Sequence, residues 1–431
     1  MKRLDEISSI KKEIEEIYNQ ALLRHSPERV VFEFLKGLAS ELSGVKTVEV
    51  VATGKCAAGM ARGASKFFGE KITRGLIITN SSKDSNPTNF ETIVASHPYP
   101  DQSSLVAGER LINFCKTTRP DSMLLYLLSG GTSSMVAAPV SGISLEEKAS
   151  LSRIMMNNGI EIEDLNEVRS AVSMIKGGGL LNYVNTPVVW NLIITDVLSE
   201  DAAVTGSGMM VKKGRNLNKT REILFKFSGD DDRTFIEGIF ERIKNQDYTS
   251  SANPVQPEIK IIDSNSKFLD TISSLATIRG LDVVISERPV SGEISDAVPS
   301  FFEKCAKVSN ERNPGDKPFL FICGSEPGVK VTGKGTGGRS CELAMRFSKL
   351  MAGRQAVLLA AGTDGKDGNS SFAGAIVDGN TFSESLKPGL EYDDFLRDSN
   401  SAEWIEKTGC GLITGETGVN LTDILIYTEV K

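Results

Sequence analysis

The chain has 431 residues, 40% of them hydrophobic and 24% charged, which is usual for a globular protein of two or three domains. Its 49 basic and 56 acidic residues give a net charge of −7 without a basic stripe, which argues against a nucleic-acid-binding protein. Two histidines and six scattered cysteines without a C-x-x-C pair argue against a zinc site and a disulfide framework. This cysteine usage favours a reducing compartment, so we expect a cytoplasmic protein. The N-terminus runs into a charged amphipathic helix, so we expect no signal peptide, and no apolar run approaches the ~20 residues of a membrane span.

The first half of the chain alternates between strand and helix patterns. Helices are predicted over residues 4–23, 27–42, 56–68, 103–116 and 162–174, and a capping box at Ser144 opens another. Strands are predicted over residues 47–52, 76–79, 92–95, 123–128 and 188–194. The fourth of these strands is almost entirely apolar, as expected inside a parallel sheet that is covered on both faces.

A polar stretch from about residue 212 to 257 separates this half from the next, and we place a domain boundary within it. Strands are then predicted over residues 259–262, 283–285, 319–322, 356–360 and 423–428, with helices ending near 279 and 308 and another over 340–351. Such alternation predicts an α/β fold with two domains, residues 1–235 and 236–431. Each domain is expected to be a mainly parallel or mixed sheet flanked by helices, a Rossmann-like arrangement.

Polar residues and glycines follow several of the predicted strands. Lys55, the segment 129–134, Asp196 and Asp364 each come just after an apolar run. Ligands of open α/β sheets bind at the carboxyl ends of the strands, so these positions predict a ligand site. Lys55 would meet an anion beside a helix N-terminus, although an exposed surface lysine would give the same pattern.

Two glycine-containing turns are candidate phosphate cradles. In the first, N–H groups and hydroxyls of Ser129, Gly130, Gly131 and Ser133 suit phosphate oxygens, with an ordinary strand-to-helix turn as the alternative. The second is the loop 331–339, which reads as strand, glycine loop, helix.

The glycine loop matches two nucleotide-binding patterns, each incompletely. Gly333, Gly335 and Gly338 fit G-x-G-x-x-G, but the acidic residue that should follow, Asp364, comes late. A P-loop would need Ser or Thr at position 335. We therefore expect an anion cradle of some kind, with a connection that binds no ligand as the alternative.

The segment 166–179 ends in three glycines and carries regularly spaced polar residues. Asn166, Arg169 and Ser173 fall along one helical stripe, with Lys176 close to it. A solvated helix face would explain the same spacing. The glycine run favours a ligand site, because glycine permits close approach of a backbone or an anion.

Asp196 and Asp364 are isolated carboxylates at strand ends. Such residues suit Mg²⁺ that is held partly by substrate phosphates, whereas a helix cap or a turn is the alternative. Glycine cradles, basic residues and two acids that could hold a metal together predict an enzyme of phosphoryl transfer, which depends mainly on positioning and cationic groups.

Taken in order, these segments resemble the type-2 glycerate kinase family, whose C-terminal part is called the MOFRL domain. The resemblance covers nearly the whole chain and rests on residues 52–61, 128–134, 166–179, 194–197 with 206–208, 333–342, 361–368 and 414–420. It implies a MOFRL region over about residues 318–428 and an active site in a cleft between two α/β domains. It also implies ATP- and Mg²⁺-dependent phosphorylation of D-glycerate, mostly to 2-phosphoglycerate.

The resemblance assigns expected roles to residues of this chain. The residues expected to be catalytic are Lys55, Arg339, Asp196 and Asp364, and either Asp could serve as a general base or hold the metal. Expected to bind glycerate are Lys55, Asn166, Arg169, Lys176 and Arg339. Expected to bind the nucleotide are Ser129, Gly130, Gly131, Ser133, Lys176, Gly177, Gly178, Gly335, Gly337 and Gly338.

The chain departs from the family pattern at residues 130–134, 339–342 and 370–371, which bears on nucleotide preference and fine substrate selectivity. Two other functions are kept as alternatives. One is a nicotinamide-dependent hydroxy-acid oxidoreductase, and the other is a non-catalytic sensor of small anions. No nucleic-acid or membrane partner is expected, and the sequence leaves a homo-oligomer open.

Overall fold

The computed structural model describes residues 2–81, 86–212, 214, 216–246, 255–313, 315–386 and 391–430. The chain divides into two compact units, and both are α/β. Unit 1 joins Met1–Ser26 to Asp263–Lys431, and unit 2 is Pro27–Ile262. The division expected from the sequence, at residues 235 and 236, therefore differs from these units at both ends. In these units the first helix groups with the C-terminal part of the chain, and residues 236–262 group with the N-terminal part. The polar stretch used for that boundary also runs partly outside the described residues, at 213, 215 and 247–254.

Unit 2 is built on a six-stranded sheet in the order β3-β2-β1-β4-β5-β6. The strands are β1 (Val48–Thr53), β2 (Ile72–Thr79), β3 (Phe90–Val94), β4 (Met123–Ser129), β5 (Val188–Ile194) and β6 (Glu258–Asp263). β1 pairs in parallel with β2 and β4, and β2–β3 and β4–β5 are also parallel. Every residue of β1 and β4 is buried, which explains why both strands are mainly apolar, with Glu49 as the charged exception.

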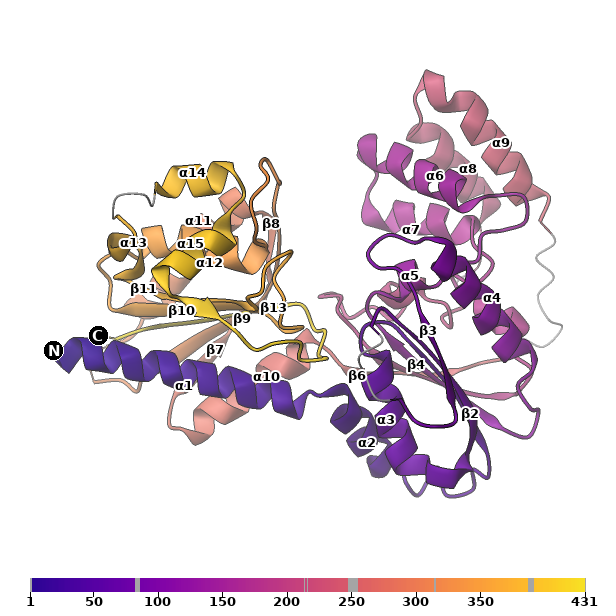
Figure 1. The fold of residues 1–431 in the computed structure, drawn as a ribbon, viewed down its shortest axis with the longest axis horizontal. Helices are drawn as coiled ribbons and strands as arrows, with labels where there is room; N and C mark the ends of the chain where they lie inside the picture. The colour runs from indigo at the N-terminus through magenta and orange to yellow at the C-terminus, as the bar shows by residue number, and fades with distance from the viewer. Residues whose placement is uncertain are drawn as a thin grey trace. The chain divides into compact units, whose positions relative to one another are not determined.

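The helices of unit 2 fall into two groups. Against or beside the sheet lie α2 (Pro27–Gly37), α3 (Ala57–Phe68), α4 (Gln102–Lys116) and the short α5 (Thr132–Met135). A separate apolar cluster is formed by α6 (Leu145–Asn157), α7 (Ile162–Ala171), α8 (Leu217–Lys226) and α9 (Arg233–Lys244), grouped together in Figure 1. The capping box at Ser144 is confirmed. Helices α8 and α9 were not predicted, because their charged sequence resembled a linker.

Unit 1 has a mixed sheet in the order β12-β11-β10-β13-β9-β7, with β8 paired to β9. The strands are β7 (Asp282–Ile285), β8 (Val290–Glu293), β9 (Phe319–Gly328), β10 (Ala356–Gly362), β11 (Gly374–Asp378), β12 (Gly411–Leu412) and β13 (Asp423–Glu429). β10 runs antiparallel to β11 and β13, and β13 runs antiparallel to β9.

Helices cover both faces of the unit 1 sheet. α1 (Lys2–Arg24) and α10 (Asn265–Ile278) lie side by side on one face, and α1 contacts β10 (Figure 1). The other face packs against α11 (Ile294–Asn310) and α12 (Arg339–Leu350) through a core that includes Phe301, Phe347 and Trp404. Three short helices complete the unit: α13 (Thr381–Glu384), α14 (Tyr392–Arg397) and α15 (Ser401–Thr408). Among the described residues, no helix combines the length and apolar character needed to cross a bilayer.

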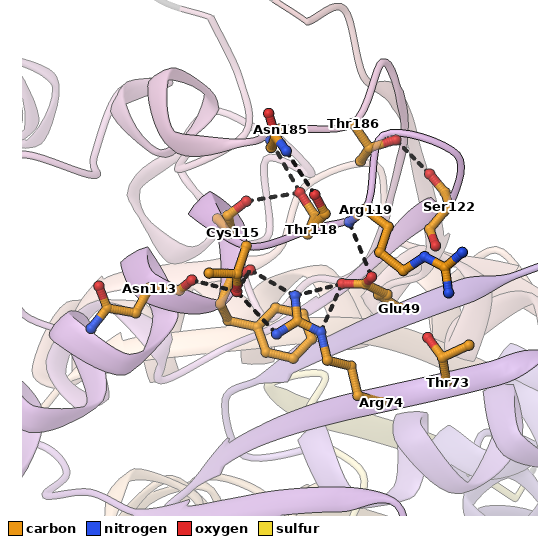
Figure 2. Close-up of polar contacts among 12 residues, drawn as sticks. Glu49, Thr73, Arg74, Asn113, Cys115, Thr118, Arg119, Ser122, Asn185 and Thr186 are labelled. Carbon is orange, nitrogen blue, oxygen red and sulfur yellow. Dashed lines mark hydrogen bonds and ion pairs between the residues drawn. The ribbon is translucent and has the colours of Figure 1, made fainter.

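A buried ion pair fixes the start of the unit 2 sheet, at the end opposite the carboxyl ends of the strands (Figure 2). Glu49 of β1 is 1% exposed, and its Oε2 accepts hydrogen bonds from Arg74 Nε and Nη2 at 2.9 and 2.6 Å. Its Oε1 accepts the N–H of Arg119 at 3.1 Å. The Arg74 guanidinium also lies over the Phe114 ring, 4.1 Å from its centroid. This cluster joins β1, β2 and α4, so we assign it a structural role.

Candidate active site

The turn that follows β4 in unit 2 meets the turn that follows β1. The N–H of Lys55 donates to the carbonyl of Gly130 at 2.9 Å, and the N–H of Cys56 donates to Ser129 Oγ at 3.1 Å. Gly54 has φ +108, and a Cβ there would lie 2.4 Å from Ser129 Oγ. Glycine is therefore required between β1 and Lys55, because no larger residue permits so close an approach. Lys55 and the serine–glycine turn thus come together, as the strand-end rule predicts.

A second contact ties this turn to the segment 205–208. Ser133 Oγ lies 2.7 Å from Ser207 Oγ, so the two hydroxyls share a hydrogen bond. Gly131, with φ +86, begins α5, and a Cβ on it would lie 3.2 Å from His97 Nε2. Ser207 itself has a positive φ of 61, which is uncommon for a residue with a side chain.

The three-glycine segment, residues 177–179, is hydrogen-bonded to the same segment 205–208. The N–H of Gly177 donates to the carbonyl of Ser207 at 3.0 Å, and the N–H of Gly178 donates to that of Gly208 at 2.8 Å. Both glycines have positive φ, 57 and 83. Ser207 thus links the turn after β4 to the backbone next to Lys176. The N–H groups of these two glycines are taken up by the chain itself, so they are not a phosphate cradle in this structure.

Three basic side chains, which we call the basic cluster, gather beside this link: Lys148, Arg169 and Lys176. Lys148 comes from α6, Arg169 from the last turn of α7, and Lys176 from the turn beyond it. A Cβ on Gly177 would lie 3.3 Å from Ser170, so the chain folds back on the end of α7. Lys148 and Lys176 are 7% and 3% exposed, and Arg169 is half-buried. Within the described part of the chain, none of the three makes an ion pair or a side-chain hydrogen bond.

Burial of like charges depresses the ionisation of the basic cluster. Burial lowers the pKa of Lys148 to about 8, and the Arg169 charge adds to this effect. Burial also lowers the pKa of Lys176 well below its usual range, with Lys148 and Arg169 contributing further, and it lowers the pKa of Arg169. Unpaired buried cations are costly, so such an arrangement fits a site that an anion neutralises.

Two further predicted residues of unit 2 lie near these elements. Asn166 sits on α7, about one turn before Arg169, as the stripe predicted. The helix, however, ends at Ala171 rather than at residue 174, so Ser173, which was expected on the stripe, and Lys176, which was expected close to it, both lie beyond the helix. Asp196 follows β5, as expected, two residues after its end.

The glycine loop of unit 1 is packed against the segment 398–402. The N–H of Gly335 donates to the carbonyl of Asp398 at 2.9 Å, and the N–H of Thr336 donates to Asn400 Oδ1 at 2.9 Å. The N–H of Gly337 donates to Asn369 Oδ1 at 2.8 Å. A Cβ on Gly335 would lie 2.3 Å from Asn400 Cβ. These glycines therefore serve close packing of the chain on itself. The open anion cradle expected from the sequence is not what this structure has.

The N-terminus of α12 already holds a carboxylate of the chain. Asp367 accepts the N–H groups of Ser340 and Cys341 at 3.1 and 2.7 Å, and it is 4% exposed. A Cβ on Gly338 would lie 2.3 Å from the same carboxylate. Burial raises the pKa of Asp367 to about 6, although these N–H groups oppose the shift. The position where a phosphate was expected is thus filled by Asp367.

Arg339 is paired with acids. Its Nε donates to Asp423 Oδ2 at 2.5 Å, and its Nη1 donates to Glu326 at 3.3 Å. Burial opposes the charge of Arg339, but Asp423 and Glu326 outweigh this and raise its pKa. Burial raises the pKa of Asp423, against the effect of Arg339, and the charge of Asp364 raises it further. Asp423 and Asp364 also add to the strong effect of burial that raises the pKa of Tyr18, whose hydroxyl donates to the carbonyl of Gly362 at 3.0 Å.

The charge near Asp364 bears on the expected metal. No group of three or more His, Cys, Asp or Glu residues suited to a metal ion occurs among the described residues. Mg²⁺ commonly takes one or two carboxylates and completes its shell with water and substrate phosphate. Asp423 lies near Asp364, so the negative charge around Asp364 is greater than that of a single carboxylate in a turn. Such a pair of acids favours a cation.

Comparison with known proteins gives matches over the full chain. A family model described as a domain of unknown function, DUF4147, matches residues 13–234, and the MOFRL family model matches residues 319–423. The D-glycerate 2-kinase of Thermotoga maritima is 31% identical, over 97% of this chain and 98% of that protein. The chain belongs to the glycerate 2-kinase family.

Two further comparisons concern the fold and the names of other relatives. The crystal structure of a glycerate kinase from Thermotoga maritima covers 98% of this chain at 30% identity, with a TM-score of 0.86 and all of that chain matched. A relative from Agrobacterium vitis, 27% identical over 87% of this chain and 97% of that protein, is provisionally named a hydroxypyruvate reductase. The predicted family and α/β class are thus confirmed.

Sequence reasoning missed several residues that the structure places beside the predicted ones. Lys148 gave no signal, because a lysine inside a polar helix pattern looks like a solvated one. Ser207 lies in a Gly-Ser-Gly segment that the family resemblance included without a role. Asp367 follows Lys366 and Asp423 follows Thr422, so nothing in the local sequence indicated that these carboxylates would be buried.

Proposed function

We propose that this chain is an ATP-dependent kinase that phosphorylates the 2-hydroxyl of D-glycerate. Its full-length similarity to a protein named D-glycerate 2-kinase supports the reaction. The observation in the structure that carries it is the basic cluster of unit 2, buried and without an acidic partner among the described residues. A transferring phosphoryl group needs cationic groups placed in advance, which this cluster supplies.

We assign the phosphate-binding part of the site to unit 2. Lys55 and the serine–glycine turn meet at the carboxyl ends of β1 and β4, and Ser207 joins that turn to Lys176. Several hydroxyls and basic groups thus face one end of the sheet, where α/β proteins bind ligands. Gly177, Gly178, Gly335, Gly337 and Gly338 shape backbone turns in this proposal and are not assigned contacts with the nucleotide.

We assign Arg339, Asp364 and Asp196 to the chemistry at the glycerate and the metal. Asp364 of unit 1 and Asp196 of unit 2 are each candidates to hold Mg²⁺ with phosphate oxygens, and the ion would neutralise charge on the phosphates. Arg339, oriented by Asp423, would present its remaining N–H groups to the glycerate carboxylate. Either aspartate could accept the proton of the 2-hydroxyl, although a loose transition state makes a strong base unnecessary.

The test of the proposal is a direct assay of the reaction. The purified chain is incubated with ATP, Mg²⁺ and D-glycerate, and the product is identified by NMR, which separates 2- from 3-phosphoglycerate. We expect 2-phosphoglycerate, a loss of at least about 100-fold in kcat/KM for Lys55→Met, and no loss for Lys71→Met, an exposed lysine at the far end of β2. A chain that yields no phosphorylated glycerate, or whose Lys55→Met variant is fully active, would count against it.

Arg339 needs a second variant, because its loss would also leave Asp423 buried without its partner. Arg339→Met alone should lower both stability and activity. Arg339→Met combined with Asp423→Asn should recover stability but not activity, since the asparagine needs no counter-ion. Recovery of activity in the double variant would show that Arg339 serves the fold alone.

A second candidate function is the hydroxy-acid oxidoreductase, favoured by the provisional name of the Agrobacterium vitis relative. The structure gives it little support, because the loop that fits G-x-G-x-x-G uses its N–H groups within the chain. NADH titration followed by fluorescence separates the two functions: binding of NADH without ATP turnover would favour the oxidoreductase. Binding of ATP or glycerate without any turnover would instead favour the sensor. The cysteines among the described residues are free thiols, which fits the cytoplasmic location that we propose.

A further inference from the structure

The basic cluster is a stronger anion site than one glycerate carboxylate requires. Lys148, Arg169 and Lys176 come from three successive segments, and two of them are at least nine-tenths buried. A carboxylate carries one negative charge and is commonly held by one bidentate arginine. A triphosphate carries several charges and offers many acceptor oxygens. Two buried lysines and a half-buried arginine, without an acidic partner among the described residues, therefore match a polyphosphate better than a carboxylate.

The surroundings of the cluster support the same ligand. The backbone beside Lys176 is held to Ser207, and the Ser207 hydroxyl contacts Ser133 in the turn after β4. Hydroxyl groups that already share a hydrogen bond can turn to donate to phosphate oxygens. The basic cluster thus lies next to polar groups at the strand ends and is not an isolated patch of lysines.

We propose that Lys148, Arg169 and Lys176 bind the polyphosphate chain of the nucleotide, with Lys148 as a phosphate-binding residue that sequence patterns do not indicate. The proposal rests on the proposed kinase function for the identity of the nucleotide. It also moves Arg169 and Lys176 from glycerate, where the sequence resemblance put them, to the phosphates. The phosphates replace the missing counter-ions, and the lysines take up protons as the anion binds.

The test is calorimetric titration of the full chain, without glycerate, using tripolyphosphate, ATP, inorganic phosphate and, separately, D-glycerate. Lys148→Met should weaken tripolyphosphate and ATP binding by about 10- to 100-fold, the usual effect of losing a charge-assisted hydrogen bond. Lys71→Met should leave both affinities unchanged. D-glycerate affinity should be the same in both variants as in the unaltered chain.

Two other readouts separate ligand binding from a structural role. Unliganded Lys148→Met should melt at the same temperature as the unaltered chain or higher, because a buried unpaired charge is removed. Tripolyphosphate binding at pH 8 should take up roughly half a proton at Lys148, since its pKa is about 8 before the anion binds. This uptake, measured in buffers of different ionisation enthalpy, should fall in Lys148→Met.

Each other outcome overturns one idea and not the other. Unchanged tripolyphosphate affinity in Lys148→Met, or a loss confined to D-glycerate, refutes the polyphosphate site even if the chain phosphorylates glycerate. A loss confined to inorganic phosphate also refutes it, because the cluster would then serve a single phosphate group. A Lys148-dependent tripolyphosphate site in a chain without kinase activity refutes the proposed function and leaves the site standing.

Discussion

Asp367 should make unit 1 less stable as the pH rises from about 4 to 6. The carboxylate is 4% exposed at the start of α12, and burial raises its pKa from the ordinary 3.8 to about 6. Below pH 4 the group is protonated in both the folded and the unfolded chain. Between the unfolded pKa of 3.8 and the folded pKa of about 6, the folded state binds more protons than the unfolded state. The free energy of unfolding therefore falls until the pH passes about 6. The difference between 3.8 and about 6 corresponds to about 3 kcal/mol.

The perturbation that isolates this effect is Asp367→Asn. Asparagine keeps an oxygen that can accept one of the two N–H groups of Ser340 and Cys341, but it cannot ionise. Relative to the unaltered chain, the variant should therefore gain about 3 kcal/mol of stability between pH 4 and pH 7. Asp393→Asn, at an exposed acid of the same unit, should show no such trend.

The assay needs a probe that belongs to unit 1. Trp404 is fully buried there, and the second tryptophan of the chain, Trp190, lies on β5 of unit 2. In a Trp190→Phe background, urea unfolding followed by tryptophan fluorescence reports unit 1 alone, and it is repeated from pH 4 to 8. If the stability difference between Asp367→Asn and its parent stays flat over this range, the buried-carboxylate reasoning is refuted.

Three further predictions concern contacts that lie inside one unit or the other and stabilise it. Glu49→Gln should destabilise unit 2 by about 2–3 kcal/mol in urea unfolding, because it weakens a buried charged hydrogen-bond cluster, whereas Glu91→Gln in an exposed ion pair should change stability by less than about 1 kcal/mol. Gly335→Ala should cost about 1–3 kcal/mol through its clash with the 398–402 segment, while Gly44→Ala, with open space around it, should stay within about 0.5 kcal/mol, and equal effects would contradict the packing role of the loop. His25→Ala should cost about 2–4 kcal/mol by thermal melting, since it removes the ring that hydrogen-bonds the buried carboxylate of Asp263 and packs against Phe268, and a cost near zero would contradict this.

The central strands were predictable because a strand that is buried on both faces consists mainly of apolar residues. β4 and β5 are mainly apolar, with Asn191 as the polar residue inside β5, and their predicted ranges agree closely with the structure. The assignment of elements to units was not predictable in the same way. Whether β6 joins the first sheet depends on which edge it pairs with, and that is a tertiary choice with no local pattern.

The glycine loop shows why a motif is a weak guide to a ligand. The same glycines are needed whether the backbone approaches a phosphate or another part of the chain. Here the acceptors are Asn369, Asp398 and Asn400, more than 30 residues away in the sequence. Lys148 is the opposite case, because it has no motif and becomes conspicuous only when its burial and lack of partners are known.

The way the chain passes between the units has a consequence for its synthesis. Helix α1 belongs to unit 1, yet its partners α10 and β10 begin only at Asn265 and Ala356. On the ribosome, unit 2 can complete its core while this amphipathic helix is still without its sheet. A fragment that begins at Pro27 would keep unit 2 whole but would uncover the part of the unit 1 sheet that α1 covers beside α10. Unit 2 could therefore be expressed separately, because it is one continuous segment of the chain. Unit 1 would need a circular rearrangement in which α1 is fused after Lys431.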